Sequence, residues 1–206
     1  LDKYTELEAE LEAKLSEEIE LKQKQYEVYR DELLTFGDDV ERKKLGEVAG
    51  VCRGKRVVRR ELSESDKDGY PVYQNSLTAM GYYAETNYPA HTTFIIGAGA
   101  AGEIGFSSTD FWAADDCFPI VCSSELIDKY AFYVLMNKRD FIATKVRKAS
   151  IPRLAREHVE DLQIPVPSPT EQQRIVKILD KYDTYTRDMI SALNTELESR
   201  KKQYAY

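Results

Sequence analysis

Leu1-Asp2-Lys3-Tyr4 begins a stretch that the chain repeats near its other end, starting at Leu179-Asp180-Lys181-Tyr182. The two copies, residues 1–26 and 179–204, also share the ending Lys-Gln-Tyr, and all matches lie at one offset of 178 residues. Two unrelated charged helices would have no reason to share both ends in a single register. The repeat therefore predicts a tandem architecture in which a long helix alternates with a globular unit.

Both copies have the pattern of a long helix that needs a partner. Residues 1–36 contain no glycine or proline, and their apolar residues recur in steps of three and four, which is typical of a coiled coil. Gly37 is expected to cap this helix. Ser168-Pro169-Thr170-Glu171 has a serine, a proline and a glutamate in the order of a capping box, which predicts a second helix over residues 169–206. One helix leads into the globular unit and the other leads out, so we expect an antiparallel coiled coil. The expected pairing residues are Leu11, Leu15, Ile19, Tyr26, Leu33, Leu179, Tyr182, Met189, Leu193 and Leu197.

Residues 37–168 are expected to form one mixed α/β (α+β) domain. Short apolar runs separated by turn residues predict strands in a mainly antiparallel or irregular sheet. These runs are residues 57–58, 71–73, 81–83, 92–96 and 118–121. A helical spacing of apolar residues begins at Ser124 and continues to Phe141, and a shorter one lies within residues 151–163.

Composition limits the classes of protein that fit the chain. Its 206 residues, 42% of them hydrophobic, allow one ordinary core plus extended helices. No run approaches the ~18 apolar residues of a membrane span, and the acidic start is not a signal-peptide pattern, so a cytoplasmic protein is expected. Cys52, Cys117 and Cys122 lack metal-ligand spacing, and there are only two histidines. We therefore expect reduced cysteines and no metal site.

Charge is distributed unevenly along the chain. The net charge is −7, and residues 1–36 hold eleven acidic and five basic residues, so the rest of the chain is close to neutral. Basic residues gather in two groups. The first is Arg42, Lys43, Lys44, Arg53, Lys55, Arg56, Arg59 and Arg60, and the second is Lys138, Arg139, Lys145, Arg147, Lys148, Arg153 and Arg156. This distribution fits a domain with one surface for a polyanion, and it fits an ordinary solvated surface equally well.

A polar stretch with interleaved tyrosines, residues 70–76, follows the first basic group. Asparagine and glutamine can form bidentate hydrogen bonds to adenine, so Tyr73, Gln74, Asn75 and Ser76 are candidates for reading bases. An ordinary polar turn is the alternative.

No catalytic constellation is found. The motif Gly-x-Gly-x-x-Gly at residues 97–102 resembles a dinucleotide fingerprint, but the sequence that follows has no helical spacing, and the fingerprint needs a helix there. A hairpin between two strands is expected instead. Asp115 and Asp116 would point apart in a strand, with no third acid or histidine nearby. His91 and His158 have no local nucleophile and are expected to be structural or at the surface.

Three segments together resemble the DNA-specificity (S) subunits of type I restriction–modification systems. Residues 93–105 with 111–118 are similar to the hallmark of the family's target-recognition domains. Residues 151–154 through 164–167 are similar to the exit from that domain, and residues 167–176 to the start of the spacer helix. Members of this family carry two recognition domains that alternate with two helices, whereas this chain has one domain between two helices. The chain thus resembles a half-sized S subunit or a fragment of a full one.

The resemblance implies a non-catalytic protein that reads half of a bipartite DNA target and docks methyltransferase (M) and restriction (R) subunits. S-adenosylmethionine would be bound by the M subunit, so this chain is expected to bind no cofactor. The expected phosphate contacts are Arg53, Lys55, Arg56, Arg59 and Arg60, and in second rank Lys145, Arg147 and Lys148. Two assemblies stay open, a monomer with paired helices and a homodimer through the helices. The alternatives to DNA recognition are a coiled-coil scaffold that binds only proteins and a stand-alone methyltransferase.

Overall fold

The computed structural model describes the backbone of residues 2–204 and the side chains of residues 9, 10, 12–196, 198, 199 and 202. The chain divides into two compact units, the helical unit (residues 1–35 and 177–206) and the mixed unit (residues 36–176). Within the described residues, no helix has the length and apolar character that a membrane crossing requires.

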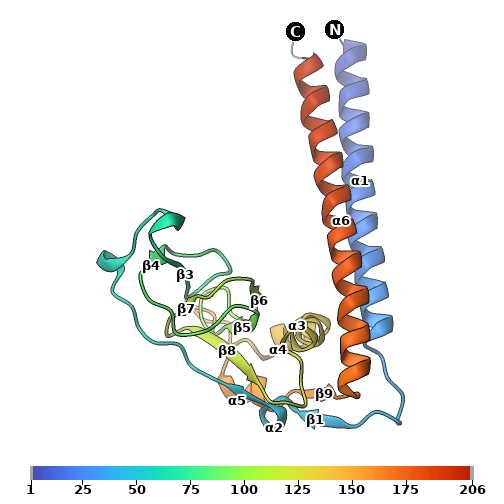
Figure 1. Ribbon diagram of the computed structural model, residues 1–206. Coiled ribbons are helices and arrows are strands. Elements are labelled where there is room, and N and C mark those ends of the chain that lie inside the picture. Colours follow the sequence, from blue (N-terminus) through green and yellow to red (C-terminus); the bar gives the residue numbers. More distant parts are fainter. Residues whose placement is uncertain (1, 205–206) are drawn as a thin grey trace. The chain divides into compact units, whose positions relative to one another are not determined.

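The helical unit contains two long helices that lie side by side and run in opposite directions (Figure 1). They are α1 (Asp2–Leu33) and most of α6 (Pro169–Tyr204). The ring of Tyr29, near the end of α1, lies 4.4 Å from the ring of Tyr182, near the start of α6. Burial, and next the nearby carboxylate of Asp183, raises the pKa of Tyr26 to about 12, so a second tyrosine of α1 also faces α6.

The predicted pairing residues differ in exposure. Leu15 and Leu179 are buried. Five others are half-buried: Ile19, Tyr26, Leu33, Met189 and Leu193. Tyr182 is 43% exposed although its ring contacts Tyr29. The side chains of Leu11 and Leu197 lie outside those that the structure describes. The interlocking side-chain packing of a coiled coil stays a prediction.

The end of α1 differs from its prediction. The helix ends at Leu33, not at residue 36. The Thr35 hydroxyl donates to the carbonyl oxygen of Asp31 at 2.7 Å, and the Thr35 N–H donates to that of Glu32 at 3.2 Å. Gly37 is not among the glycines with positive φ, so it is not the expected left-handed cap. A threonine side chain and a tightened last turn satisfy the terminal carbonyls instead.

The mixed unit combines small sheets with short helices, which confirms the predicted mixed α/β class. Its strands are β1 (Arg42–Lys44), β2 (Ala49–Val51), β3 (Tyr70–Tyr73), β4 (Tyr82–Tyr83), β5 (Thr92–Ile96), β6 (Ile104–Ser107), β7 (Trp112–Ala113), β8 (Cys117–Cys122) and β9 (Gln163–Pro165). Its helices are α2 (Leu45–Val48), α3 (Asp128–Asn137), α4 (Arg139–Lys145) and α5 (Arg156–Glu160), with 3-10 turns at Arg59–Glu61 and Asp66–Asp68.

The core of the mixed unit forms around an antiparallel sheet with the strand order β2-β8-β5-β6. All five residues of β5 are buried, including the two threonines at its start. Helix α3 packs against β5, β6 and β8. The glycine segment 97–102 joins β5 to β6 as a hairpin, which confirms the prediction. Gly99 and Gly102 have φ of 83° and 92°, a conformation that favours glycine.

Other elements differ from the sequence predictions. Val57 and Val58 lie outside any strand, in an irregular segment. The helix expected from Ser124 begins at Asp128 and is broken into α3 and α4 at Lys138. Within residues 151–163 the only helix is the short α5. Trp112 in β7 is half-buried, and its ring Nε1 donates to the Lys55 carbonyl oxygen at 2.8 Å.

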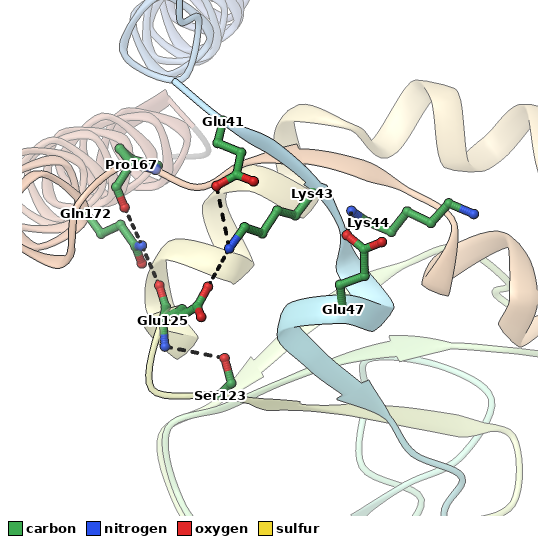
Figure 2. Close-up of polar contacts among 8 residues, drawn as sticks. All are labelled: Glu41, Lys43, Lys44, Glu47, Ser123, Glu125, Pro167 and Gln172. Carbon is green, nitrogen blue, oxygen red and sulfur yellow. Dashed lines mark hydrogen bonds and ion pairs between the residues drawn. The ribbon is translucent and has the colours of Figure 1, made fainter. Parts of the chain in front are cut away.

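The entry and exit of the mixed unit are paired with each other. Strands β1 and β9 are antiparallel, with Lys43 opposite Ile164. Lys43 also contacts Glu125 at 2.7 Å and Glu41 at 3.6 Å (Figure 2). The next residue, Lys44, forms an ion pair with Asp161 at 2.7 Å. These two lysines of the first basic group are therefore paired with carboxylates inside the unit.

Gln172, in the first turn of α6, is fully buried and uses both ends of its amide. Its Nε2 donates to the carbonyl oxygens of Glu125 at 2.7 Å and Pro167 at 2.9 Å (Figure 2). Its Oε1 accepts from the Ile127 N–H at 2.9 Å. One side chain thus joins the start of α6 to the turn before α3. Sequence reasoning missed this residue because glutamine is usually exposed.

The start of α6 confirms part of the predicted capping box. The Glu171 N–H donates to the Ser168 hydroxyl at 3.3 Å, as an N-cap requires. The Glu171 carboxylate accepts two hydrogen bonds from Arg174, at 2.6 and 2.8 Å. This arginine lowers the pKa of Glu171. In a full capping box the Glu171 carboxylate would accept from the Ser168 backbone N–H. Here it accepts from the Arg174 side chain instead.

Candidate nucleic-acid interface

The basic segment, residues 53–60, is fixed by its backbone and leaves its side chains exposed. The Gly54 N–H donates to the Cys117 carbonyl oxygen at 3.0 Å, and the Lys55 N–H donates to that of Ala113 at 2.8 Å. Gly54 is required for this approach, because a Cβ there would lie 2.0 Å from the carbonyl oxygen of Ala114. The segment is thus held against the strands at Gly54 and Lys55 by backbone contacts that leave the cationic groups of Lys55, Arg56, Arg59 and Arg60 unused.

The cations of the basic segment are available to a partner. Lys55, Arg56, Arg59 and Arg60 are exposed. Within the described residues, none of these four side chains forms a hydrogen bond or an ion pair. Arg53 is also exposed, and its Nε donates to the Asp115 carbonyl oxygen at 3.2 Å. Lys43 and Lys44 of β1 are paired with carboxylates, whereas no described carboxylate forms an ion pair with the basic segment. The positive charge of the basic segment therefore stays exposed.

The second candidate stretch packs on the glycine hairpin. The Ala100 N–H donates to the Asn75 carbonyl oxygen at 2.9 Å, and a Cβ on Gly99 would lie 2.8 Å from that oxygen. Asn75 is exposed and Gln74 half-buried, and neither side-chain amide has a hydrogen-bond partner among the residues that the structure describes. The Ser76 hydroxyl donates to the Thr78 carbonyl oxygen at 3.0 Å. The hairpin therefore supports a loop that offers two free amides.

Tyr73 has a different position from the three residues that follow it. Its ring stacks on Phe94 at 4.7 Å between centroids and meets the edge of Phe111 at 5.7 Å. Burial raises the pKa of its hydroxyl. We therefore assign Tyr73 to the support of the loop, because stacking on a base would cost it these core contacts.

A concave surface, the basic cavity, brings the two basic groups together. It has a volume of about 660 Å³ and is lined by side chains from segments far apart in the sequence. The basic residues in its lining are Arg53, Lys145, Arg147, Arg153, Arg156 and His158. The carboxylates in the lining are only Asp116 and Glu157. Of the second-rank candidates, Lys145 and Arg147 thus lie with Arg53, whereas Lys148 is exposed outside the lining.

Two arginines of the cavity lie directly opposite each other. Arg147 and Arg153 exchange both backbone hydrogen bonds, at 2.8 and 3.2 Å, in an isolated antiparallel bridge. In such a pair the side chains lie on one side of the ladder. Arg153 also pairs with Ala98 of the glycine hairpin. Like charges directly opposite each other are destabilising by on the order of a few tenths of a kcal/mol. No carboxylate among the described residues forms an ion pair with either arginine.

The sequence placed Arg153 and Arg156 in a basic group but gave neither a role. The place of Arg153 in the cavity depends on its bridge to Arg147, six positions earlier, and on its bridge to Ala98, 55 positions earlier. Non-local pairing of this kind leaves no local signal. The sequence signal nearest to this site is Pro152, because a proline favours an extended backbone in the residue before it. In the structure, the Pro152 carbonyl oxygen accepts from the Gly99 N–H at 3.1 Å.

The residues considered for catalysis or metal binding are not brought together. Within the described residues there is no group of three histidine, cysteine or acidic side chains that could hold a metal. The three cysteines are free, and burial raises the pKa of both Cys117 and Cys122. His158 lines the basic cavity, and His91 is an exposed turn residue with a φ of 63°. The geometry thus offers cationic and amide groups for binding.

Comparison with known proteins gives one consistent result. The family model described as type I restriction modification DNA specificity domain matches residues 37–199. The specificity subunit of type I restriction enzyme EcoR124I/EcoR124II from Escherichia coli is 30% identical over 100% of this chain and 55% of its own length.

Solved structures share the fold. An S subunit of a type I restriction-modification system from M. genitalium matches with a TM-score of 0.73 and 20% identity, over 95% of this chain and 57% of its own. A chain from a study of complex assembly and conformational transition of the type I R-M system matches with a TM-score of 0.80 and 14% identity, over 98% and 54%. The chain therefore spans about half the length of these relatives.

Proposed function

Because the chain belongs to the family of type I restriction modification DNA specificity domains, we propose that it reads one half of a bipartite DNA target and has no catalytic role of its own. The observation that carries this proposal is the basic segment beside a loop with free amides. Four exposed cations without protein partners suit phosphate oxygens, and amides such as that of Asn75 suit base edges.

The proposed division of roles follows from this chemistry. Arg53, Lys55, Arg56, Arg59 and Arg60 contact phosphates, and Gln74, Asn75 and Ser76 contact bases. The helices act as an antiparallel coiled coil whose length sets the distance to the other half of the target. Since the chain carries one recognition domain, the second would come from another copy through the helices or from the rest of a longer S subunit.

The proposed partners are double-stranded DNA and the M and R subunits of the complex, in the cytoplasm. The M subunit would bind S-adenosylmethionine and methylate the DNA, and the R subunit would cleave it. The competing function is a coiled-coil scaffold that binds proteins without reading DNA. The exposed basic segment favours DNA over the scaffold, because lysine and arginine side chains neutralise the backbone phosphates that supply much of the affinity for DNA.

Selection of bound duplexes from a random pool, with the M subunit present, tests the proposal. We expect a defined half-site. Arg56→Glu combined with Arg59→Glu should weaken binding to all sequences and reduce its salt dependence, whereas Lys181→Glu on α6 serves as a charge control. Asn75→Ala should relax preference at one base pair, by about 1–3 kcal/mol. A selected pool without any sequence preference would favour the scaffold.

A further inference from the structure

The basic cavity holds more positive charge than the mixed unit needs for its own structure. Five arginine or lysine side chains line it against two carboxylates. One of the five, Arg156, contacts Glu160 of its own helix at 3.2 Å. The backbone bridge places Arg147 and Arg153 opposite each other, and both carry exposed side chains of like charge. An anion between them would turn this repulsion into attraction.

The chemistry of the lining selects the class of anion. Guanidinium groups form paired hydrogen bonds with phosphate oxygens, and four of the lining residues are arginines. Arg53 belongs to the lining and is also the first residue of the basic segment. The cavity is therefore continuous with a row of exposed cations. A single small anion would use only the cavity, whereas a chain of phosphates could occupy both.

We propose that the basic cavity binds a backbone phosphate of duplex DNA between Arg147 and Arg153, and that Arg53 continues this contact onto the basic segment. This inference rests on the proposed DNA-binding function and adds a second anchoring point to it. The contact carries no sequence information, because phosphates are the same at every base pair. It would fix the orientation of the duplex relative to the loop that contains Asn75.

Arg147→Gln and Arg153→Gln test the site by fluorescence anisotropy with a mixed-sequence duplex, on the full chain. Each variant should bind roughly tenfold more weakly, and the negative slope of log affinity against log salt should decrease in magnitude by about 0.9 for one lost phosphate contact. Arg139→Gln is the matched control, because this exposed arginine pairs with Asp140 at 3.6 Å and lies outside the cavity lining. Slopes equal to that of the unmodified chain in both cavity variants, or no binding of the unmodified chain, would overturn the proposal.

Thermal melting separates a binding role from a structural one. Replacing one arginine removes the repulsion across the bridge, so both variants should melt at the same or a higher temperature. A lower melting temperature would show that the pair stabilises the fold, and would overturn the proposal. Calorimetry with inorganic phosphate is a second measurement on the same variants. If the variants lose phosphate binding but keep the salt slope of the unmodified chain for DNA, the cavity is a site for small anions and the assignment to DNA is overturned.

The salt-slope experiment on the cavity variants is independent of the selection experiment that tests sequence reading. A mixed-sequence duplex measures charge contacts, whereas selection from a random pool measures base preference. Loss of salt slope in the cavity variants without any selected half-site would support the phosphate site and contradict specificity. A selected half-site with unchanged slopes would support specificity and contradict the phosphate site.

Discussion

Replacement of Gln172 tests how the start of α6 is attached to the mixed unit. Gln172→Met keeps the length of the side chain and removes three hydrogen bonds, to the carbonyls of Glu125 and Pro167 and the N–H of Ile127. A buried polar group without its partner costs about 1–3 kcal/mol. Three such groups at the lower figure give a loss of about 3 kcal/mol in the free energy of unfolding.

Urea denaturation followed by the fluorescence of Trp112 measures this loss. Trp112 is the single tryptophan of the chain and lies in the mixed unit, so its signal reports on the part that Gln172 joins. Gln173→Met is the matched control, because Gln173 is the exposed neighbour on the same helix turn. Its effect should stay within about 0.5 kcal/mol. Equal effects of the two substitutions would refute the reasoning.

Gln172→Glu adds a test by pH. A carboxylate would face the two carbonyl oxygens that now accept from Nε2, so this variant should be less stable at neutral pH than Gln172→Met. This environment raises the pKa of the introduced acid above its ordinary value of ~4.3, so the unfolded state loses the proton first as the pH rises. The free energy of unfolding should then fall as the pH rises from the pKa of the unfolded state to the raised pKa of the folded state. It should recover on acidification, when the protonated acid can again donate a hydrogen bond. A penalty independent of pH would contradict this account.

Three further predictions concern other parts of the fold. Gly54→Ala should destabilise the mixed unit by about 1–3 kcal/mol, since its Cβ would lie 2.0 Å from the Ala114 carbonyl oxygen, as measured by urea denaturation. Burial raises the pKa of Asp128, so its contribution to stability falls as the pH rises through that pKa; Asp128→Asn should therefore gain stability relative to the unmodified chain from acid to neutral pH, in melts at several pH values. Tyr182→Ala should destabilise the helical unit by about 1–2 kcal/mol through loss of its contact with Tyr29, as measured by circular dichroism.

Matched substitutions serve as controls for these predictions. Gly50→Ala introduces a methyl group whose nearest neighbour lies at 3.8 Å, so it should be close to neutral. Tyr185→Ala removes a tyrosine of α6 that is 61% exposed and should cost little. A larger effect of either control than of its test substitution would contradict the packing arguments. For Asp128→Asn, a stability difference that does not change with pH would contradict the assigned burial effect.

Local chemistry explains which parts of the fold the sequence predicted. The start of α6 depends on Ser168 and its neighbours, so a short motif identifies it. The glycine hairpin at residues 97–102 was predicted because the sequence that follows cannot open a helix, and β5 and β6 pair across it. The end of α1 was predicted less well. Gly37 offered a cap, but Thr35, two residues earlier, satisfies the carbonyl of Asp31.

Charge alone did not separate binding residues from paired ones. Lys43 and Arg53 belong to one basic group in the sequence, yet only Lys43 has carboxylate partners, from Glu125 and Glu41. The stronger contact, with Glu125 at 2.7 Å, depends on the meeting of β1 with the turn before α3 and comes from 82 positions away in the sequence. A composition-based argument counts such lysines as available to a polyanion. The structure removes them from the candidate interface and leaves the residues after β2.

The pairing of Arg147 with Arg153 shows why a site can be invisible in sequence and still have a physical signature. Each arginine alone is an ordinary solvated residue, and their closeness arises only from the backbone bridge between them. The bridge costs free energy in the absence of an anion, because it holds two like charges opposite each other. Stability alone would favour a carboxylate or a neutral residue at one of the two positions. An arrangement that is unfavourable for folding and favourable for phosphate is what distinguishes a binding role. Arg153→Gln should therefore reduce the magnitude of the salt slope without lowering the melting temperature.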